Sequence, residues 1–160
     1  MSEHQQYITL GIGEESFAIP ILHVQEILDL RPIARLPHAP HGLVGLIDVR
    51  EQSMPVMDLR AMLGLPSVTA AADTRILVLQ LEMEHRALRL GLVVDRVFEV
   101  TALDTASLDA RPEIGRRWRS DCIAGIGRRR GGFVILLDVH RLIGEDGALM
   151  AGVETLSEPA

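Results

Sequence analysis

Short blocks of hydrophobic and β-branched residues, separated by turn signals, run along most of this chain, which is the pattern of a β-rich protein. Residues 7–12 and 16–19 are two such blocks joined by a Gly-Glu-Glu turn, so they predict a hairpin. Pro20 ends it, because proline cannot donate a hydrogen bond to a strand ladder. Residues 21–30 fit either a short helix or an irregular strand, since their apolar spacing is helical and their β-branched content is high.

The same reading extends through the rest of the chain. Further strands are predicted at residues 43–49, 53–57, 75–81, 86–94, 97–103, 122–127 and 133–137, and turns, loops or irregular connections at 31–42, 50–52, 64–74, 82–84, 104–121 and 128–132. Asp58 and Asp138 each follow an apolar strand, and each precedes a short apolar stripe that ends at a glycine. An aspartate there can accept hydrogen bonds from free backbone N–H groups, which predicts two short capped helices.

The two halves of the chain share a pattern. The blocks 43–46 and 58–64 match 123–126 and 138–144 at a displacement of 80 residues, and the block 24–27 matches 97–100 at a displacement of 73. The second half therefore holds about seven extra residues, for which the connection at 104–121 is the natural place. Any two strand–helix units look somewhat alike, but two blocks at one displacement favour two related subdomains.

Each half thus has about five strands and one capped helix, which suits a small barrel, because closure removes exposed sheet edges. We expect one mainly β domain over residues 1–160, made of two intertwined five-stranded β-barrel subdomains at roughly 7–74 and 75–145, with a flexible tail at 146–160. Neither half holds enough residues for an adequate core of its own. A shared interface is therefore expected, and a groove along it is a natural binding place.

Composition narrows the class of protein. Of the 160 residues 48% are hydrophobic and 24% charged, as in an ordinary soluble domain. The net charge is −6, and all 16 basic residues are arginine, so we expect no general nucleic-acid binding. A single cysteine makes no internal disulfide, no apolar run is long enough to span a bilayer, and the N-terminus lacks a signal-peptide core. These features predict a cytoplasmic globular protein without membrane insertion.

Catalytic and metal-binding signals are weak. The Gly-x-Gly sequences at 11–13 and 125–127 lead into strands, whereas a phosphate loop leads into a helix. His38 and His41 alternate with prolines, and a zinc site needs two more ligands. Cys122 follows an aspartate, which opposes thiolate formation, so it is expected to pack as a small hydrophobic residue. The sequence predicts a protein that is not an enzyme and has no cofactor or metal.

The arginines leave alternatives open. Arg116, Arg117 and Arg119 surround Trp118, and a second run covers residues 128–130. Both runs fit a solvated surface loop, and both also fit pairing with an acidic partner protein, because guanidinium groups bind carboxylates in two-pronged geometry.

Arg50 directly follows a buried strand, between Asp48 and Glu51. It is either a turn residue with local acidic neighbours, which contributes little, or a cation held at a binding edge with Glu26 as its distant partner.

Several segments along the chain form a recognisable series: Phe17-Ala18-Ile19-Pro20, Val24-Gln25-Glu26-Ile27, Leu36-Pro37-His38-Ala39-Pro40, residues 42–50 and 54–60, Gly91-Leu92-Val93-Val94-Asp95-Arg96-Val97, Pro112-Glu113-Ile114-Gly115 and residues 123–127. In this order and spacing, the chain resembles the CheW-type coupling proteins of bacterial chemosensory arrays over about residues 7–145. The resemblance implies two SH3-like barrels around a shared core. It also implies a non-enzymatic adaptor that couples transmembrane chemoreceptors to a CheA-type histidine kinase.

The resemblance also implies site residues. The receptor's cytoplasmic tip is expected in the groove between the barrels, with Val24, Glu26, Ile27 and Arg50 on the receptor-binding side. The kinase regulatory domain is the second expected partner, and the protein is expected in the cytoplasm at membrane-anchored receptor arrays. Gly45, in the strand that leads to Arg50, is expected to tolerate a side chain poorly.

The family's Asn-Leu-Arg-Gly motif appears here as Asp48-Val49-Arg50-Glu51. Gly45, Asp48 and Glu51 are candidates for kinase binding or coupling. If the usual glycine takes a positive φ, Glu51 is strained or the turn is rebuilt. Two carboxylates beside Arg50 also lower the positive character of this edge. An alternative function is therefore coupling in a paralogous array, controlling surface motility or biofilm, with altered partner choice.

Overall fold

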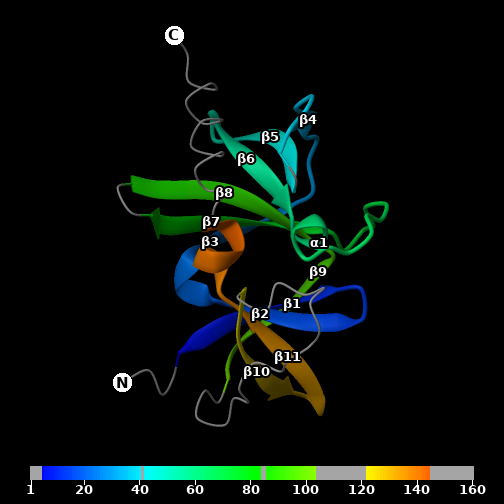
Figure 1. Ribbon diagram of the computed structural model, residues 1–160, viewed down its shortest axis with the longest axis vertical. Helices are drawn as coiled ribbons and strands as arrows, with labels where there is room; N and C mark the ends of the chain where they lie inside the picture. Colours follow the sequence, from blue (N-terminus) through cyan, green and yellow to red (C-terminus); the bar gives the residue numbers. More distant parts are fainter. Residues whose placement is uncertain (1–4, 41, 84–85, 104–121, 145–160) are drawn as a thin grey trace.

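The computed structural model describes residues 5–40, 42–83, 86–103 and 122–144 of the chain (Figure 1). In chain order its elements are β1 (Gln6–Ile12), β2 (Glu15–Pro20), the 3-10 helix η1 (Ile21–His23), β3 (Val24–Asp29), β4 (Ala34–Arg35), β5 (Leu43–Val49), β6 (Gln52–Asp58), α1 (Leu59–Met62), β7 (Arg75–Met83), β8 (Arg86–Val94), β9 (Arg96–Ala102), β10 (Ile123–Arg129) and β11 (Gly132–Leu137). Residues 139–144 are helical. The mainly β fold that the sequence predicts is confirmed.

The capped helices form as the sequence predicts. The Asp58 carboxylate accepts a hydrogen bond from the backbone N–H of Arg60 at 3.1 Å, and that of Asp138 accepts from the N–H of Arg141 at 3.1 Å. Residues 21–30 contain both alternatives, because η1 is followed by β3. The predicted turn at 128–132 is shorter in the structure, since β10 continues to Arg129. The predicted connection at 104–121 and the tail at 146–160 lie outside the described residues.

The strands form two sheets that do not coincide with the two halves of the chain. Sheet A has the order β10-β11-β2-β1-β9, and sheet B has the order β3-β7-β8-β6-β5-β4. The expected division into residues 7–74 and 75–145 is therefore corrected, because each sheet takes strands from both sides of that boundary. The hairpin β1–β2 joins strands of the second half, and the hairpin β7–β8 joins strands of the first, so the subdomains exchange their leading hairpins.

Within this exchange, five strands of sheet B repeat the strand order of sheet A. The series β5-β6-β8-β7-β3 in sheet B has the same order as β10-β11-β2-β1-β9 in sheet A. Val56 lies opposite Gly91 in a parallel pair in sheet B, and Leu136 lies opposite Ala18 in the corresponding pair in sheet A. These partners are related by the two displacements seen in the sequence, 80 and 73 residues. The two sheets are thus related copies.

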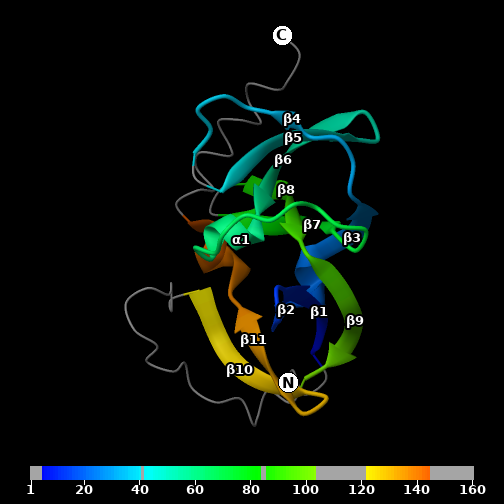
Figure 2. The ribbon, with the colours of Figure 1, turned by 90° about the vertical axis from the view of Figure 1, so that its right-hand side faces the viewer.

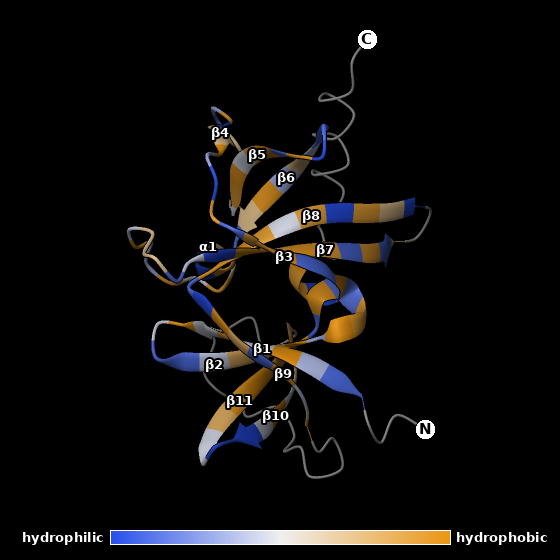
Figure 3. Ribbon diagram, turned by 180° about the vertical axis from the view of Figure 1, so that it is seen from behind, coloured by the Kyte–Doolittle hydropathy of each residue, from blue (hydrophilic) through white to orange (hydrophobic). Residues whose placement is uncertain are grey.

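The buried apolar residues form three clusters. The largest lies between the two sheets and includes leucines of β7 and β8, apolar residues of β1 and β2, and residues of both short helices. Figures 1 and 2 show these helices between the sheets, and Figure 3 shows blue polar colouring towards the tips of hairpins β1–β2 and β7–β8. Smaller clusters lie on the other faces: Ile47, Val49, Met54, Val56, Ile76 and Val78 in sheet B, and Tyr7, Ala18, Leu103, Val134 and Leu136 in sheet A.

One polar contact ties the sheets together at the point where the chain passes from β8 to β9. Arg60 of α1 binds Asp95 through two hydrogen bonds, of 3.0 Å from Nε to Oδ1 and 2.6 Å from Nη2 to Oδ2. The backbone N–H of Gly13, in the β1–β2 turn of sheet A, donates to the same carboxylate at 2.7 Å. The Arg60 hydrogen bond, more than any other contact, lowers the pKa of Asp95 below its usual range.

We predict that Asp95→Asn destabilises the protein by roughly 1.5–3 kcal/mol at pH 7, because a mostly buried guanidinium then loses its charged partner. The folded-state pKa of Asp95 is lowered, so the carboxylate contributes fully above its unfolded pKa of about 3.9 and loses that contribution as pH falls through the folded value. Urea unfolding at pH 7 and pH 3 should therefore show a smaller difference from wild type at pH 3. The exposed Asp73→Asn serves as control, and an equal difference at both pH values would contradict the prediction.

Candidate functional site

A polar pocket lies at one end of sheet B, where the apolar face formed by Met54, Val56, Ile76 and Val78 gives way to charged and amide side chains. The pocket has a volume of about 600 Å³ and is lined by Gln25, Glu26, Arg50, Gln52, Gln80 and Arg89. Alternate residues of a strand face the same side, so Gln80 continues the row of Ile76 and Val78 in β7. The pocket is the polar continuation of the interior of sheet B.

Arg50 and Glu26 form the ion pair that the sequence suggests. Arg50 Nη1 donates to Glu26 Oε1 at 3.0 Å, and Nη2 donates to Oε2 at 2.7 Å. The pair joins the edge strand β3 to the turn after β5, and it holds the guanidinium in a fixed orientation. The Arg50 side chain is nevertheless 73% exposed, against 20% for Glu26. An exposed pair contributes little stability, so its main physical effect is to orient a donor group toward solvent.

A second arginine completes the pocket, and the sequence reasoning missed it. Arg89 of β8 donates from Nε to Gln25 Oε1 at 2.9 Å and from Nη1 to Gln52 Oε1 at 3.1 Å. Gln25 in turn donates to Gln80 across the sheet. The sequence did hold a signal for this cluster. Each of the strands β3, β6, β7 and β8 has a long polar residue at this end of the sheet, and the four side chains form one cluster. The signal becomes visible only when the strand order is known.

The remaining predicted site residues do not line this pocket. Val24 is partly buried against the core between the sheets, whereas Ile27 is 44% exposed on β3. Gly45 lies in β5, where a Cβ would collide with the backbone carbonyl oxygen of Ala34 in β4. This close strand packing supports the expectation that Gly45 tolerates a side chain poorly. Asp48 and Glu51 are exposed on either side of Arg50.

The turn at Arg50 and Glu51 is strained in the way the sequence suggests. Arg50 has φ 51° and Glu51 has φ 67°, as a two-residue hairpin loop with both central residues in the left-handed region requires. In the equivalent turn of sheet A, Arg130 has φ 50° and Gly131 has φ 81°. Sheet A thus has a glycine at the second position, where sheet B has a glutamate.

The described part of the chain offers no second candidate site among its cysteine and metal-binding residue types. Cys122 is buried and packs in the core between the sheets, as predicted. Among residues 5–40, 42–83, 86–103 and 122–144, no three His, Cys, Asp or Glu side chains gather in a way that could hold a metal ion. No helix in those segments is long and apolar enough to span a membrane. His41 and the arginines around Trp118, for which the sequence favours surface loops, lie outside the described residues.

The chain is thus a module of two related β sheets with one shared apolar core, and a polar pocket with an exposed, paired arginine lies at the end of sheet B. The family model for the CheW-like domain matches residues 6–147. The chemotaxis protein CheW of Helicobacter pylori is 30% identical over 141 residues, covering 88% of this chain and 82% of that protein. CheW of Treponema pallidum is 26% identical over 140 residues, with the same coverage. The crystal structure of the scaffolding protein TtCheW from Thermoanaerobacter tengcongensis superimposes with a TM-score of 0.77 at 25% identity, covering 90% of each chain.

The chain belongs to the CheW-like family. Its function is that of a chemosensory coupling adaptor, which connects chemoreceptors with a CheA-type histidine kinase. The SH3-like barrel fold implied by the resemblance is likewise confirmed, since the two sheets match the CheW scaffold along most of their length.

We predict that Glu51→Gly stabilises the protein by about 0.5–1 kcal/mol, because glycine adopts a positive φ without the steric cost that a Cβ imposes. The matched change in the equivalent turn, Gly131→Ala, should destabilise by a similar amount. Urea unfolding of both variants measures the effect. A loss of stability in Glu51→Gly would show that the glutamate side chain makes contacts that outweigh its backbone strain.

Proposed function

We propose that the polar pocket is the receptor-binding side of the adaptor and that Val24, Glu26, Ile27 and Arg50 contact the cytoplasmic tip of a chemoreceptor. The observation that carries this proposal is the state of Arg50, whose guanidinium is fixed by Glu26 and yet 73% exposed. A donor that is already oriented loses less conformational entropy when a partner binds. Ile27, which is exposed and follows Glu26 in β3, supplies apolar contact area.

The kinase regulatory domain is the second proposed partner, and Gly45, Asp48 and Glu51 are proposed to affect its coupling. Asp48 and Glu51 are exposed carboxylates next to Arg50, so they act on the local charge that a partner meets. Gly45 acts indirectly, because it permits the close approach of β4 to β5. We also propose that the protein is located in the cytoplasm at membrane-anchored receptor arrays.

The carboxylates of Asp48 and Glu51 beside Arg50 favour a partner that differs in charge from the usual one. They lower the positive potential of the β5–β6 turn, so a partner with fewer acidic groups is accommodated better than a strongly acidic one. The retained strain at Glu51 is consistent with a functional role for that side chain. Coupling in a paralogous array that controls surface motility or biofilm is therefore the second candidate function.

We predict that Arg50→Glu lowers affinity for a receptor cytoplasmic tip by about tenfold or more, because it replaces an oriented donor with a carboxylate facing Glu26. Co-sedimentation with receptor tips measures this loss, and urea unfolding should remain within about 1 kcal/mol of wild type, as expected for an exposed pair. Arg35→Glu, an exposed change of the same charge in β4, should leave receptor binding unchanged.

The charge-swapped double variant Glu26→Arg with Arg50→Glu separates two roles of the pair. It restores an ion pair across the pocket but presents the opposite charge to solvent. If Arg50 contacts the receptor, the double variant remains defective in co-sedimentation. Full recovery would show that the pair acts only by joining β3 to the turn after β5, and receptor binding by Arg50 would then be ruled out.

A further inference from the structure

The internal repeat contains one contact that differs between its two copies. The chain passes between the sheets at η1, which joins β2 to β3, and at Asp95, which joins β8 to β9. Under the displacement of 73 residues η1 corresponds to residues 94–96, and under that of 80 the helix at 139–144 corresponds to α1. Arg60, which binds Asp95 at one crossing, therefore has His140 as its counterpart at the other.

His140 contacts His23 of η1 through its imidazole ring. The ring centres are 5.1 Å apart and the ring planes meet at 75°, which is an edge-to-face arrangement. Both residues are partly buried. Leu142 and Ile143 of the same helix belong to the main apolar cluster, and Ile21 of η1 packs against that cluster. The two rings thus meet at the edge of the shared core, each on an element that is anchored in it.

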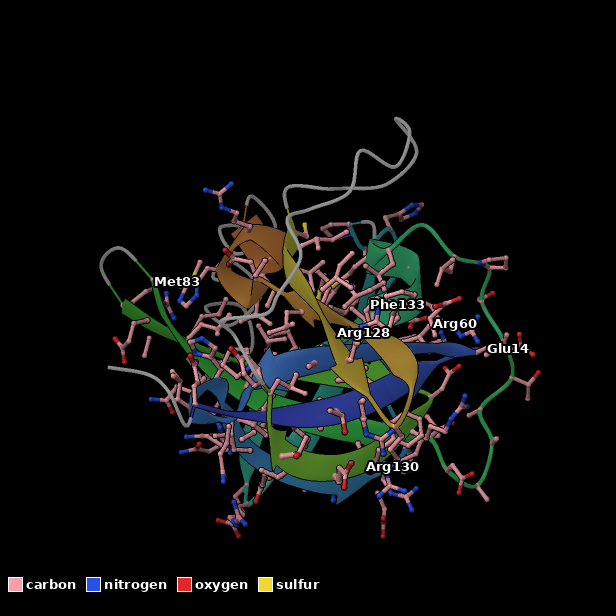
Figure 4. All side chains as sticks on the ribbon, turned by 90° about the horizontal axis from the view of Figure 1, so that it is seen from below. Glu14, Arg60, Met83, Arg128, Arg130 and Phe133 are labelled. Carbon is pink, nitrogen blue, oxygen red and sulfur yellow. The ribbon has the colours of Figure 1, made fainter. Side chains whose placement is uncertain are left out.

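The two crossings lie on different sides of the molecule and are spanned by different chemistry. Figure 4 shows Arg60 beside the β1–β2 turn near Glu14, whereas the orange helix that carries His140 lies toward Met83 at the end of β7. Figure 1 agrees, with α1 and the orange helix on different sides. Arg60 and Asp95 hold opposite charges throughout the range between pH 5 and 8, but histidine changes its charge within that range.

The surroundings of His23 oppose its protonation. Burial is the main cause that lowers the pKa of His23 below its ordinary value of 6.5, and His140 lowers it further. Asp138, the N-cap of the helix at 139–144, acts in the opposite direction. The lowered value does not arise from the titratable side chains of β1 and β7, which also pack against η1: Tyr7, Arg75 and Glu82.

We propose that the His23–His140 contact is a proton-sensitive joint between the two sheets. When both imidazoles are neutral, the rings pack against each other, and when both are protonated, two like charges face each other and repel. Asp138 balances at most one of these charges. Acid therefore loosens the crossing at η1 and leaves the crossing at Asp95 closed by its ion pair, so the sheets are held together less firmly at low pH.

The joint lies next to the strand assigned to the receptor, and this step rests on the proposed function. His23 is followed directly by Val24, the first residue of β3, and Glu26 lies two positions further along the strand. A loosened η1 holds the start of β3 less firmly, and with it the Glu26–Arg50 pair. The joint thereby makes receptor affinity fall as pH falls.

A double-mutant cycle of His23→Gln, His140→Gln and the double variant, unfolded in urea at pH 7.5 and pH 5.5, tests the joint. Because the folded-state pKa of His23 is lowered, its contribution to stability is complete above the unfolded pKa of about 6.5 and is lost as pH falls through the folded value. We expect the coupling between the two positions to become less favourable at pH 5.5 by more than about threefold in the unfolding equilibrium constant. A smaller change overturns the proposal. His38→Gln, at an exposed histidine, is the control and should keep the pH dependence of wild type.

NMR titration of the imidazoles tests the same joint within the folded protein. We expect His23 to titrate below 6.5 in wild type and its midpoint to rise in His140→Gln, because a neighbouring like charge has been removed. A midpoint that does not move in His140→Gln overturns the proposal.

Receptor binding separates the joint from the proposed function. Between pH 7.5 and pH 5.5 we expect affinity for a receptor cytoplasmic tip to fall by about threefold more in wild type than in His140→Gln, and the comparison cancels any titration of the receptor itself. An equal loss in both proteins overturns the link between the joint and β3. Arg50→Glu reports independently, because its normal receptor binding at pH 7.5 removes the receptor assignment, while the urea and NMR results still decide whether the joint exists.

Discussion

The exchange of hairpins between the two sheets is the constraint on which the rest of this structure depends. The hairpin β7–β8 completes a sheet built from the first half of the chain, and β1–β2 completes a sheet built from the second. Leucines on one face of β7 and β8 pack against β1 and β2, so the main apolar cluster belongs to both sheets at once. Neither half can bury its apolar surface alone, and the two sheets are held as one unit.

The ion pairs of the molecule follow from this arrangement. Arg60 and Asp95 lie where the chain leaves sheet B for sheet A, and the Gly13 N–H adds a direct link to the turn of β1–β2. The pairs Arg50–Glu26 and Arg129–Glu99 each span the gap between strands that make no backbone ladder with one another. Side-chain pairs thus close each sheet where backbone hydrogen bonds do not.

Much of this could be predicted from the sequence, because the informative signals are local. Alternating apolar positions predict most strands, and Asp58 and Asp138 predict the helix caps. The Glu26–Arg50 pair was one of two alternatives drawn from residue chemistry, and the strain at Glu51 was expected from the resemblance, whose motif has glycine at that position. The choice of partner hairpin could not be predicted, since related hairpins have similar patterns whichever half they join. Arg89 was missed for the same reason: its partners come from β3 and β6, and only the strand order brings them together.

The two ends of the molecule place different side chains on nearly the same backbone. The backbone of the β5–β6 and β10–β11 turns is nearly the same, with positive φ at Arg50 and Arg130. The supporting side chains differ, with amides and Arg89 on one sheet and phenylalanines with Arg129 on the other. Because the shared core and the Arg60–Asp95 pair hold both ends in one body, a partner bound at one end is placed in a defined position relative to the other. Coupling through an adaptor requires this rigidity, since a loose joint would lower the effective concentration of the second partner.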